Sequence, residues 1–254
     1  MFKFLLQPRW IAITLLCILL LPAFDALSQW QWSRLHARQS YNKDIVANIN
    51  APQTDLSSLL VAGVGTKGVP VANQWRSVQL KGHWLADKQV LVRKKSMESN
   101  AGFWVITPFQ SDTGYVVMVN RGWHAADNSA VDSPTVTPPP SGQVELVGRI
   151  RLVVDRQKAR PTDLPAGQVD AVMPSEILPG DQTISDIYLE MTASRPESRS
   201  TDLREIPVPE ITEGPHRSYA LQWILFGIMT IIGWVVLVRN EYLEQKNRQA
   251  ELSL

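Results

Sequence analysis

Two long apolar runs lie near the ends of the chain, and the stretch between them is mixed in polarity. The first run starts at Trp10 and extends to about Trp30, with Asp25 as its charged residue. The second run starts at Tyr219, ends at Val238 and contains no charged residue. Because a helix of about 20 apolar residues crosses the hydrocarbon core of a bilayer, the pattern predicts two transmembrane helices. We expect them over residues 10–30 and 219–238, with a short segment 1–9 before the first and a tail 239–254 after the second.

A secretory signal peptide is the alternative interpretation of the first run, since Lys3 and Arg9 precede a short apolar stretch. The small residues near the end of this stretch, Ala23 and Ala26, do not have the A-x-A spacing of a cleavage site. We therefore favour an uncleaved membrane anchor. For the second run, the alternative is a buried helix of a soluble protein, which the length and lack of charge of the run argue against.

Helical spacing continues beyond the first apolar run. Trp32, Leu35, Ile45 and Ile49 fall on one broad face of a helix. We therefore predict a helical stalk over residues 31–50 that continues the first span out of the membrane.

The middle of the chain changes to a period of two, which is the period of β-strands. A hairpin turn is expected at Ser111–Gly114, and a Pro-rich connector at Ser133–Pro140 cannot join a strand ladder. Residues 51–73 are expected to be a mixed loop, and the Pro- and Gly-rich segment 160–186 an irregular excursion. The predicted fold is a mainly antiparallel β domain, a small barrel or sandwich over residues 51–218, flanked by the two transmembrane helices. Strands are expected at 77–84, 89–93, 102–107, 115–120, 143–153 and 187–191.

The charge composition argues against nucleic-acid binding. The chain has 25 Lys and Arg residues against 24 Asp and Glu residues, a net charge of +1, so it lacks the basic footprint that a phosphate backbone requires. The lone cysteine, Cys17, excludes an internal disulfide, a CxxC redox motif, a cysteine zinc site and a CxxCH haem attachment. A copper carrier with a pair of thiolates is excluded for the same reason.

Catalytic templates are absent from the sequence. There is no G-x-S-x-G elbow, no Walker sequence and no H-E-x-x-H motif. The histidines His36, His83, His124 and His216 are scattered along the chain, and nothing singles out an acidic pair as an acid–base couple. We therefore expect a protein that is not an enzyme and has no catalytic residues.

The sequence Asn120-Arg-Gly-Trp123 is expected to end a strand and enter a turn. Gly122 would supply a positive φ, and Arg121 would bind backbone groups or a carboxylate. Trp123 would pack against the core. A structural role for this motif is therefore favoured over a ligand-binding role.

His216 has the most distinctive position among the histidines, because it lies three residues before the second apolar run. Tyr219 and Trp223 follow at i+3 and i+7, which lie on the same face of a helix, and Arg217 is adjacent. One imidazole and two aromatic rings suit the ligation and shelter of a haem, and the arginine suits a propionate. The alternative is an aromatic belt at the membrane interface, which needs no ligand.

Several short motifs follow one another over about residues 10–238. They are Trp30-Gln-Trp-x-x-Arg34, Val78-x-Leu-x-Gly-x-Trp-x-x-x-x-Gln-Val-Leu-Val92, Gly102-Phe-Trp-Val-Ile-Thr-Pro-Phe109, Val119-Asn-Arg-Gly-Trp123, Gly142-x-Val-x-Leu-x-Gly-x-Ile-Arg151 and His216-x-x-Tyr219-Ala-x-x-Trp223. In this order, between two spans and with no cysteine site, they resemble the Surfeit locus protein 1 family of cytochrome c oxidase assembly factors. Each motif is short, and their joint order is what makes the resemblance specific.

The resemblance implies a role in the assembly of haem-copper cytochrome c oxidase. It implies that the protein aids maturation of subunit I, alongside other assembly factors, by transiently binding or delivering haem a. It also implies that His216 is an axial ligand of the haem iron, with Tyr219 and Trp223 shaping the pocket and Arg217 beside a propionate. The alternative is a membrane scaffold that binds no haem and stabilises an oxidase assembly intermediate through protein contacts.

Two spans would put both termini on the same side of a membrane. Lys and Arg residues are balanced between the termini and the inner ends of the long loop, so the positive-inside rule does not decide which side this is. The resemblance implies a two-pass protein of the cell inner (plasma) membrane. Both termini would then be cytoplasmic and the central domain extracytoplasmic.

Overall fold

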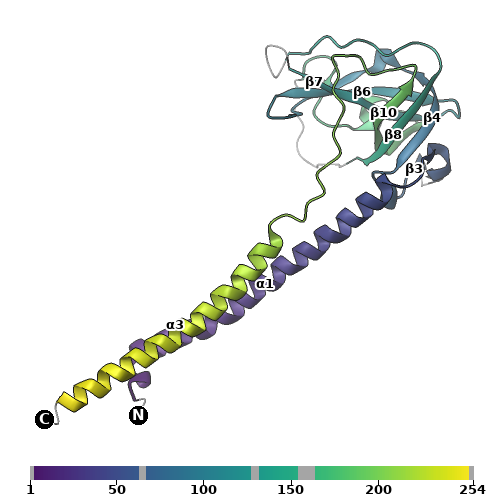
Figure 1. Cartoon of the computed structure of the whole chain (residues 1–254). Coiled ribbons are helices and arrows are strands. Elements are labelled where there is room, and N and C mark those ends of the chain that lie inside the picture. The colour runs from purple at the N-terminus through teal and green to yellow at the C-terminus, as the bar shows by residue number, and fades with distance from the viewer. Residues whose placement is uncertain (1–2, 63–66, 127–131, 154–163, 252–254) are drawn as a thin grey trace. The chain divides into compact units, whose positions relative to one another are not determined.

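The computed structural model describes residues 3–62, 67–126, 132–153 and 164–251. The chain separates into two compact units. One is helical and combines the residues up to Lys43 with those from Glu210 onward, and the other comprises Asp44–Pro209 and contains the β-sheet (Figure 1). The predicted fold class, two apolar helices flanking a mainly antiparallel β domain, is confirmed.

Two long helices dominate the helical unit. They are α1 (Pro8–Ile49), preceded by the short 3-10 turn η1 (Lys3–Leu6), and α3 (His216–Glu251). Each contains an apolar stretch long enough to cross a bilayer, and almost none of that stretch is buried within the described chain. A core helix of a soluble protein would be mostly buried, so this exposure fits two membrane spans.

The helices are longer than the predicted spans. Residues 31–49 of the predicted stalk, which was expected over 31–50, belong to α1, and α1 is one continuous helix through the first apolar run. Helix α3 begins three residues before the predicted start of the second span and continues to Glu251, so most of the predicted tail is helical. Residues 210–218, expected in the β domain, group with the helices instead.

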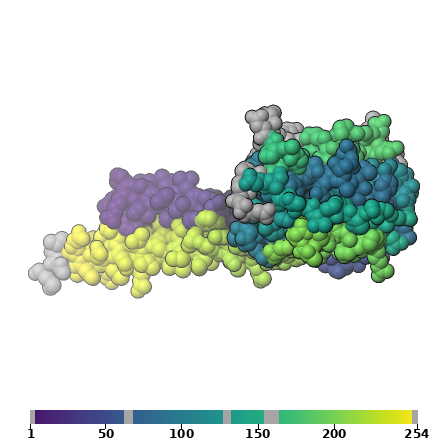
Figure 2. All heavy atoms as spheres, turned by 90° about the horizontal axis from the view of Figure 1, so that it is seen from above, coloured from purple at the N-terminus to yellow at the C-terminus, as the bar shows by residue number. Residues whose placement is uncertain are grey.

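The two helices lie side by side and antiparallel, as both views of the molecule show (Figures 1 and 2). Trp234 Nε1 donates to Thr14 Oγ1 at 3.0 Å near one end of the apolar stretches. Near the other end, Ser28 Oγ donates to the carbonyl oxygen of Ala220 at 3.1 Å. Residue numbers thus increase along α1 where they decrease along α3, so the two helices are antiparallel. The N-terminal end of α1 and the C-terminal end of α3, the outer ends of the two helices, therefore lie at the same end of the pair.

The β domain contains an eight-stranded sheet and a separate two-stranded one. The two-stranded sheet pairs β2 (Val61–Ala62) with β3 (Lys67–Gly68). Short helices and turns lie between the strands, namely η2 (Leu56–Leu59), η3 (Val71–Asn73), η4 (Ala86–Lys88) and α2 (Pro174–Ile177). The strands of the larger sheet are β1 (Thr54–Asp55), β4 (Ser77–Trp84), β5 (Val90–Val92), β6 (Gly102–Ser111), β7 (Val116–Ala125), β8 (Val144–Leu152), β9 (Gln168–Val169) and β10 (Thr183–Arg195).

The long strands close into a barrel. The larger sheet contains the run β4–β8–β10–β7–β6, and an additional pairing joins β6 back to β4. A ring with an odd number of strands cannot alternate direction at every step, so one neighbouring pair must be parallel. That pair is β7 with β10, while the other pairs in the ring are antiparallel. Counted along the chain, the ring order is 1-2-3-5-4, the order of the OB-type Greek-key barrel.

Alternating side chains of these strands fill the barrel interior. In β4 the residues from Val78 to Trp84 alternate between buried and exposed, which matches the predicted period of two. β6 and β7 are buried on both faces over most of their length, because further segments of the chain cover their outer face. The main core includes Val78, Leu80, Trp84, Phe109, Val117, Val119, Val144, Leu146, Ile150, Ile187 and Leu189.

Several stretches are more ordered than the sequence predicts. From residue 164 onward, the segment 160–186 contains β9, α2 and the start of β10, so an irregular excursion was wrong for this part, while 160–163 lie outside the described residues. β10 exceeds the predicted 187–191 because it pairs with both β7 and β8. The predicted loop 51–73 contains β1, η2, the two-stranded sheet and η3.

The predicted turn at Asn120–Trp123 was also wrong. β7 continues to Ala125, and its register against β6 shifts at this point, with Val105 opposite Gly122 and Ile106 opposite Asn120. Arg121 is therefore the extra residue of a β-bulge. Gly122 has the predicted positive φ, +153°, but uses it within the bulge.

Candidate functional site

Helix α3 begins at His216, directly after Gly214 and Pro215. Gly214 has a φ of +68°, a left-handed conformation that glycine adopts without a steric penalty. Pro215 has no backbone N–H, and the N–H groups at a helix N-terminus have no acceptor within the helix. A proline is therefore well tolerated directly before α3. This local sequence places the partly buried imidazole of His216 in the first turn of α3, beside α1.

The ring of His216 is oriented by Gln31 of α1. The Nδ1 atom of His216 and the Oε1 atom of Gln31 are 2.9 Å apart. An amide oxygen can only accept a hydrogen bond, so Nδ1 is the donor in this contact, which favours the tautomer that leaves a lone pair on Nε2. Within the described part of the chain, Nε2 has no hydrogen-bond partner. A histidine with one nitrogen held by a neighbour and the other free has the arrangement of a metal ligand.

A hollow of about 390 Å³ lies at this histidine. Two arginines, Arg34 and Arg38, contribute to its wall from α1, one helical turn apart. The carboxylate of Glu213 is its acidic group and accepts a hydrogen bond from Gln39 Nε2 at 2.8 Å. The lining residues are Arg34, Ala37, Arg38, Tyr41, Thr212, Glu213, Gly214 and His216.

Hydrogen bonds fasten the segment before α3 to α1. Arg38 Nε donates to the carbonyl oxygen of Thr212 at 3.1 Å, and Asn42 Nδ2 donates to the same oxygen at 3.0 Å. The guanidinium of Arg38 also lies over the Tyr41 ring, 5.8 Å from its centroid. The hollow is thus held between two chain segments that are distant in sequence.

The structure brings together some of the residues that the sequence singled out. The ring of Trp223 stacks on Phe24 of α1 with centroids 5.9 Å apart, so Trp223 and His216 both face α1. Tyr219 is 46% exposed and Arg217 is exposed, and neither lines the hollow. The ligand roles of all of these residues remain predictions.

Sequence reasoning missed Gln31, Arg34, Arg38 and Tyr41 as neighbours of His216. The signal for the first two was present, because the motif Trp30-Gln-Trp-x-x-Arg34 contains both. Residues 31, 34 and 38 also follow the i, i+3, i+7 spacing of one helix face. Their proximity to a histidine about 180 residues later in the chain required the packing of α1 against α3.

A histidine with a free Nε2 and two arginines in one hollow are groups that a haem would require. A Cβ built on Gly214 would lie 3.8 Å from Nε2 of His216 and 3.6 Å from its Cδ2, which is ordinary van der Waals contact with the ring. Over the described residues, no group of three or more His, Cys, Asp and Glu side chains could hold a bare metal ion. A metal carried by a macrocycle needs only one such ligand from the protein.

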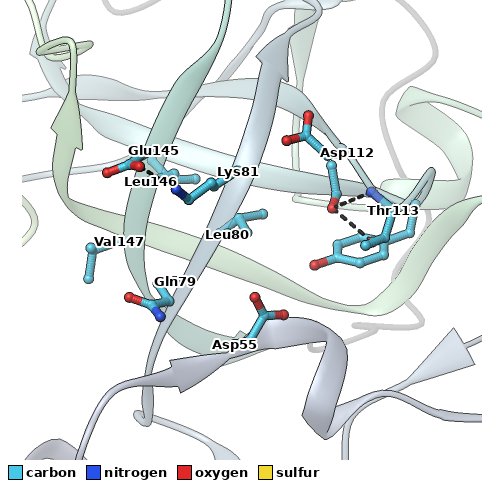
Figure 3. A pocket seen from close by; sticks show the side chains of 11 residues that line it. Asp55, Gln79, Leu80, Lys81, Asp112, Thr113, Glu145, Leu146 and Val147 are labelled. Carbon is cyan, nitrogen blue, oxygen red and sulfur yellow. Dashed lines mark hydrogen bonds and ion pairs between the residues drawn. The ribbon is translucent and has the colours of Figure 1, made fainter.

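A second hollow, of about 460 Å³, lies on the β domain between β1, β4, β8 and the turn after β6 (Figure 3). Lys81 pairs with Glu145 at 2.5 Å across it, and this contact raises the pKa of Lys81 and lowers that of Glu145. Asp55 and Asp112 add two further carboxylates, so negative charge is in excess. Its lining includes no histidine, cysteine or arginine, and we assign no chemistry to it.

Arg121 of the β domain is fully buried and acts in packing. Its Nε donates to the carbonyl oxygen of Ser198 at 2.9 Å, its Nη1 to Gln89 Oε1 at 2.8 Å and its Nη2 to the carbonyl oxygen of Thr137 at 3.0 Å. Burial lowers the pKa of the guanidinium to about 10, so it stays charged at neutral pH. The predicted structural role of Arg121 is confirmed, with backbone oxygens as its main acceptors.

Comparison with known proteins identifies one family. The SURF1 family model matches residues 18–228 of this chain. A SURF1-like protein of Mycobacterium tuberculosis is 30% identical over 235 residues, which cover 91% of this chain and 83% of that protein. A SURF1-like protein of Rickettsia felis is 24% identical over 225 residues, 85% of this chain and 92% of that protein.

One further relative has a descriptive name. It is the cytochrome oxidase assembly protein SHY1 of Saccharomyces cerevisiae, which is 34% identical over 61 residues. That match covers 24% of this chain and 16% of the yeast protein.

Proposed function

This chain belongs to the SURF1 family, and from that premise we propose that it acts in the assembly of a haem-copper cytochrome c oxidase. The name of the yeast relative, a cytochrome oxidase assembly protein, supports this role. Within it, we propose that the protein binds haem a at His216 and delivers it during the maturation of subunit I. Subunit I and other assembly factors are the protein partners in this proposal.

One observation carries the haem part of the proposal. Gln31 holds Nδ1 of His216, and Nε2 faces no hydrogen-bond partner among the described residues, at the edge of a hollow. A bound haem would supply an iron that can take a nitrogen ligand, together with two carboxylates. His216 would hold the iron through the Nε2 lone pair, and the hydrogen bond from Nδ1 would fix the orientation of the ring and increase its basicity.

Other residues of the helical unit have supporting roles in this proposal. Trp223 and Phe24 form a stacked aromatic wall further along the helices, within the apolar stretches. Tyr219 and Arg217 are exposed on the first turns of α3, where they would contact the part of the ligand outside the hollow. A single protein ligand and an open hollow suit release, because a carrier must bind its cargo loosely enough to pass it on.

The proposed activity is a non-covalent transfer and not catalysis. The chain's own residues bind, orient and release a ligand, and no bond of that ligand is made or broken. This is consistent with membership of a family of assembly factors.

We propose that the protein is a two-pass protein of the cell inner membrane. The support is the antiparallel pairing of two apolar helices, which puts their outer ends on one side. In the proposed orientation both termini are cytoplasmic and the β domain is extracytoplasmic.

A visible absorption spectrum tests the haem proposal. The full chain is purified in mild detergent from cells that make haem a, beside the His216→Ala variant. We expect a haem a band in the parent that is lost or shifted in the variant. Gel filtration and thermal unfolding of both proteins check that the variant is folded.

The absence of haem from both folded proteins would overturn the haem proposal. If the oxidase still copurified in that case, the scaffold that acts through protein contacts alone would replace it. The structure offers that alternative a surface, since apolar side chains of α3 such as Ile228, Met229 and Ile232 are about half exposed.

A further inference from the structure

We infer that Arg34 and Arg38 form a subsite for an anionic oxygen group beside His216. In the proposed function, on which this inference rests, that group is a propionate carboxylate of the haem. Both arginines line the same hollow as His216 and come from consecutive turns of α1.

The two guanidinium groups have nitrogen atoms to spare. Arg34 has neither a hydrogen bond nor an ion pair with any residue that the structure describes. Arg38 uses its Nε for the carbonyl oxygen of Thr212 and stacks over Tyr41, so its terminal nitrogens are held in place without a partner among the described residues. A fixed guanidinium with free terminal N–H groups is suited to bidentate binding of a carboxylate or phosphate.

The charge in the hollow favours an anion. Its lining contains two arginines and one carboxylate, that of Glu213, which accepts a hydrogen bond from Gln39. The hollow on the β domain has the opposite balance, with Asp55, Asp112 and Glu145 against Lys81. The two hollows therefore select for opposite charges, and only the one at His216 is suited to a carboxylate.

This inference moves the carboxylate partner away from Arg217. Arg34, Arg38 and Arg217 are all exposed, but Arg217 does not line the hollow, whereas Arg34 and Arg38 do. Arg34 belongs to the motif Trp30-Gln-Trp-x-x-Arg34, so the inference also gives that motif a function: Gln31 orients the histidine, and Arg34 binds the acid.

A lipid phosphate at the membrane edge offers the same anionic oxygen chemistry as a propionate. Anionic headgroups attract basic residues close to a span, and the hollow lies at the start of α3, next to its apolar stretch. The test therefore has to separate a carboxylate on a porphyrin from a phosphate on a lipid.

The first probe is metal-free protoporphyrin IX, which has the two propionates but no iron. Its affinity for the full-length protein in a neutral detergent is measured by fluorescence and compared with that of its dimethyl ester, which has no carboxylate charge. We expect the parent to bind the acid about tenfold more tightly than the ester. Arg34→Gln should abolish most of this preference, whereas Arg34→Lys should retain part of it.

Two further variants define the result. Arg239→Gln removes an exposed arginine at the far end of the apolar stretch of α3 and should leave the preference unchanged. Arg38→Gln should reduce the preference, and a loss of its bond to Thr212 is detected separately by thermal unfolding.

An acid-over-ester preference that survives both Arg34→Gln and Arg38→Gln overturns the inference, and so does a preference that is lost in Arg217→Gln alone. Failure of the proposed function would give a different result. The absorption spectrum of ferric haem with the parent would then be the same as with His216→Ala, and the arginine variants would not change this.

The second probe is a lipid nanodisc of phosphatidylcholine with or without phosphatidylglycerol. If the parent binds neither porphyrin, retention of phosphatidylglycerol that falls in Arg34→Gln supports the anion subsite with a lipid phosphate as its ligand. If Arg34→Gln retained as much phosphatidylglycerol as the parent, the anion subsite would be overturned.

Discussion

Gln31 and His216 are joined by a hydrogen bond of 2.9 Å between Oε1 and Nδ1, although 185 positions separate them in the chain. Gln31 lies in α1 directly after the first apolar stretch, and His216 lies in the first turn of α3, directly before the second. Since an amide oxygen cannot donate, the contact also sets the tautomer of the imidazole and leaves Nε2 with its lone pair. One neutral side chain thus determines which nitrogen of His216 is available to a metal.

Replacing Gln31 should weaken haem binding without removing the ligand itself. In Gln31→Leu the ring of His216 loses its acceptor, so Nδ1 is no longer held and the imidazole rotates or changes tautomer. Loss of an orienting partner of a metal-ligating histidine typically reduces affinity by about 10- to 100-fold. The measurement is a titration of the apoprotein with haem, followed by absorbance.

Gln29→Leu is the control for this prediction, because Gln29 is exposed on the same helix and bonds only to Asp25 among the described residues. Gln31→Glu retains an acceptor for Nδ1 and should restore most of the affinity. Equal affinities for Gln31→Leu and Gln29→Leu would show that the hydrogen bond does not support ligation.

A methyl group at Gly214 should obstruct the free nitrogen of His216. The Cβ of Gly214→Ala would lie 3.8 Å from Nε2, in van der Waals contact with the ring, so a macrocycle bound at this nitrogen would have to accommodate the added methyl group. The φ of +68° also costs an alanine about 1 kcal/mol in folding stability. We expect loss of the haem band at a small cost in thermal stability.

Gly142→Ala separates the two effects, because Gly142 has a φ of +90° and nothing within 4 Å of its added Cβ. It should show the backbone cost alone and keep the haem band. A haem band of parental intensity in Gly214→Ala would contradict the proposed approach to Nε2.

Local secondary structure can be predicted from a single sequence much further than contacts between segments that are distant in the chain. Apolar runs and a period of two are local signals, so the two long apolar helices, β4 and the fold class could be predicted. The closure of the barrel by β4 and β6 depends on pairing between distant strands, and no local pattern reports it. The bond from Gln31 to His216 is hidden for the same reason.

Local signals also have more than one solution. Gly122 does require a positive φ, which sequence reasoning interpreted as a turn. The strand instead continues through a bulge, because β6 supplies partners on both sides of the extra residue, Arg121. Likewise, Pro and Gly in 160–186 argued against regular structure, whereas the start of β10 is stabilised by its neighbour β7.

Arg121 should be essential to the folding of the β domain. In Arg121→Met the carbonyl oxygens of Ser198 and Thr137 and the amide oxygen of Gln89 lose their buried donor. Leaving buried acceptors without partners should lower the free energy of unfolding by about 3 kcal/mol or more. Urea unfolding of the full chain, followed by tryptophan fluorescence, measures this change.

Lys88→Met is the control, since the ion pair of Lys88 with Asp87 is exposed and should change the free energy of unfolding by less than about 0.5 kcal/mol. If Arg121→Met unfolded at the same urea concentration as the control, the buried guanidinium would not be holding the covering segments onto the barrel.

The membrane topology can be tested with single cysteines, because Cys17 is the lone cysteine of the chain. In a Cys17→Ser background, Ser141→Cys places a thiol at an exposed site of the β domain, and Gln249→Cys places one at an exposed site near the end of α3. The antiparallel helix pair puts the outer ends of α1 and α3 on one side of a membrane, so the chain between the two spans would emerge on the other. A membrane-impermeant maleimide should label Ser141→Cys in intact spheroplasts and Gln249→Cys only after lysis.

Each labelling pattern decides a different part of the topology. Labelling of Gln249→Cys alone in spheroplasts would reverse the orientation while keeping two spans. Labelling of both thiols before lysis would place the two sites on one side, so the chain could not cross the membrane at α3 as proposed.

A third thiol, introduced by Leu6→Cys, tests whether α1 spans the membrane. It should be labelled under the same conditions as Gln249→Cys, because Leu6 lies just before α1 and is 76% exposed. If Leu6→Cys were labelled with Ser141→Cys instead, α1 would not span the membrane, and His216 could not lie beside a paired transmembrane helix.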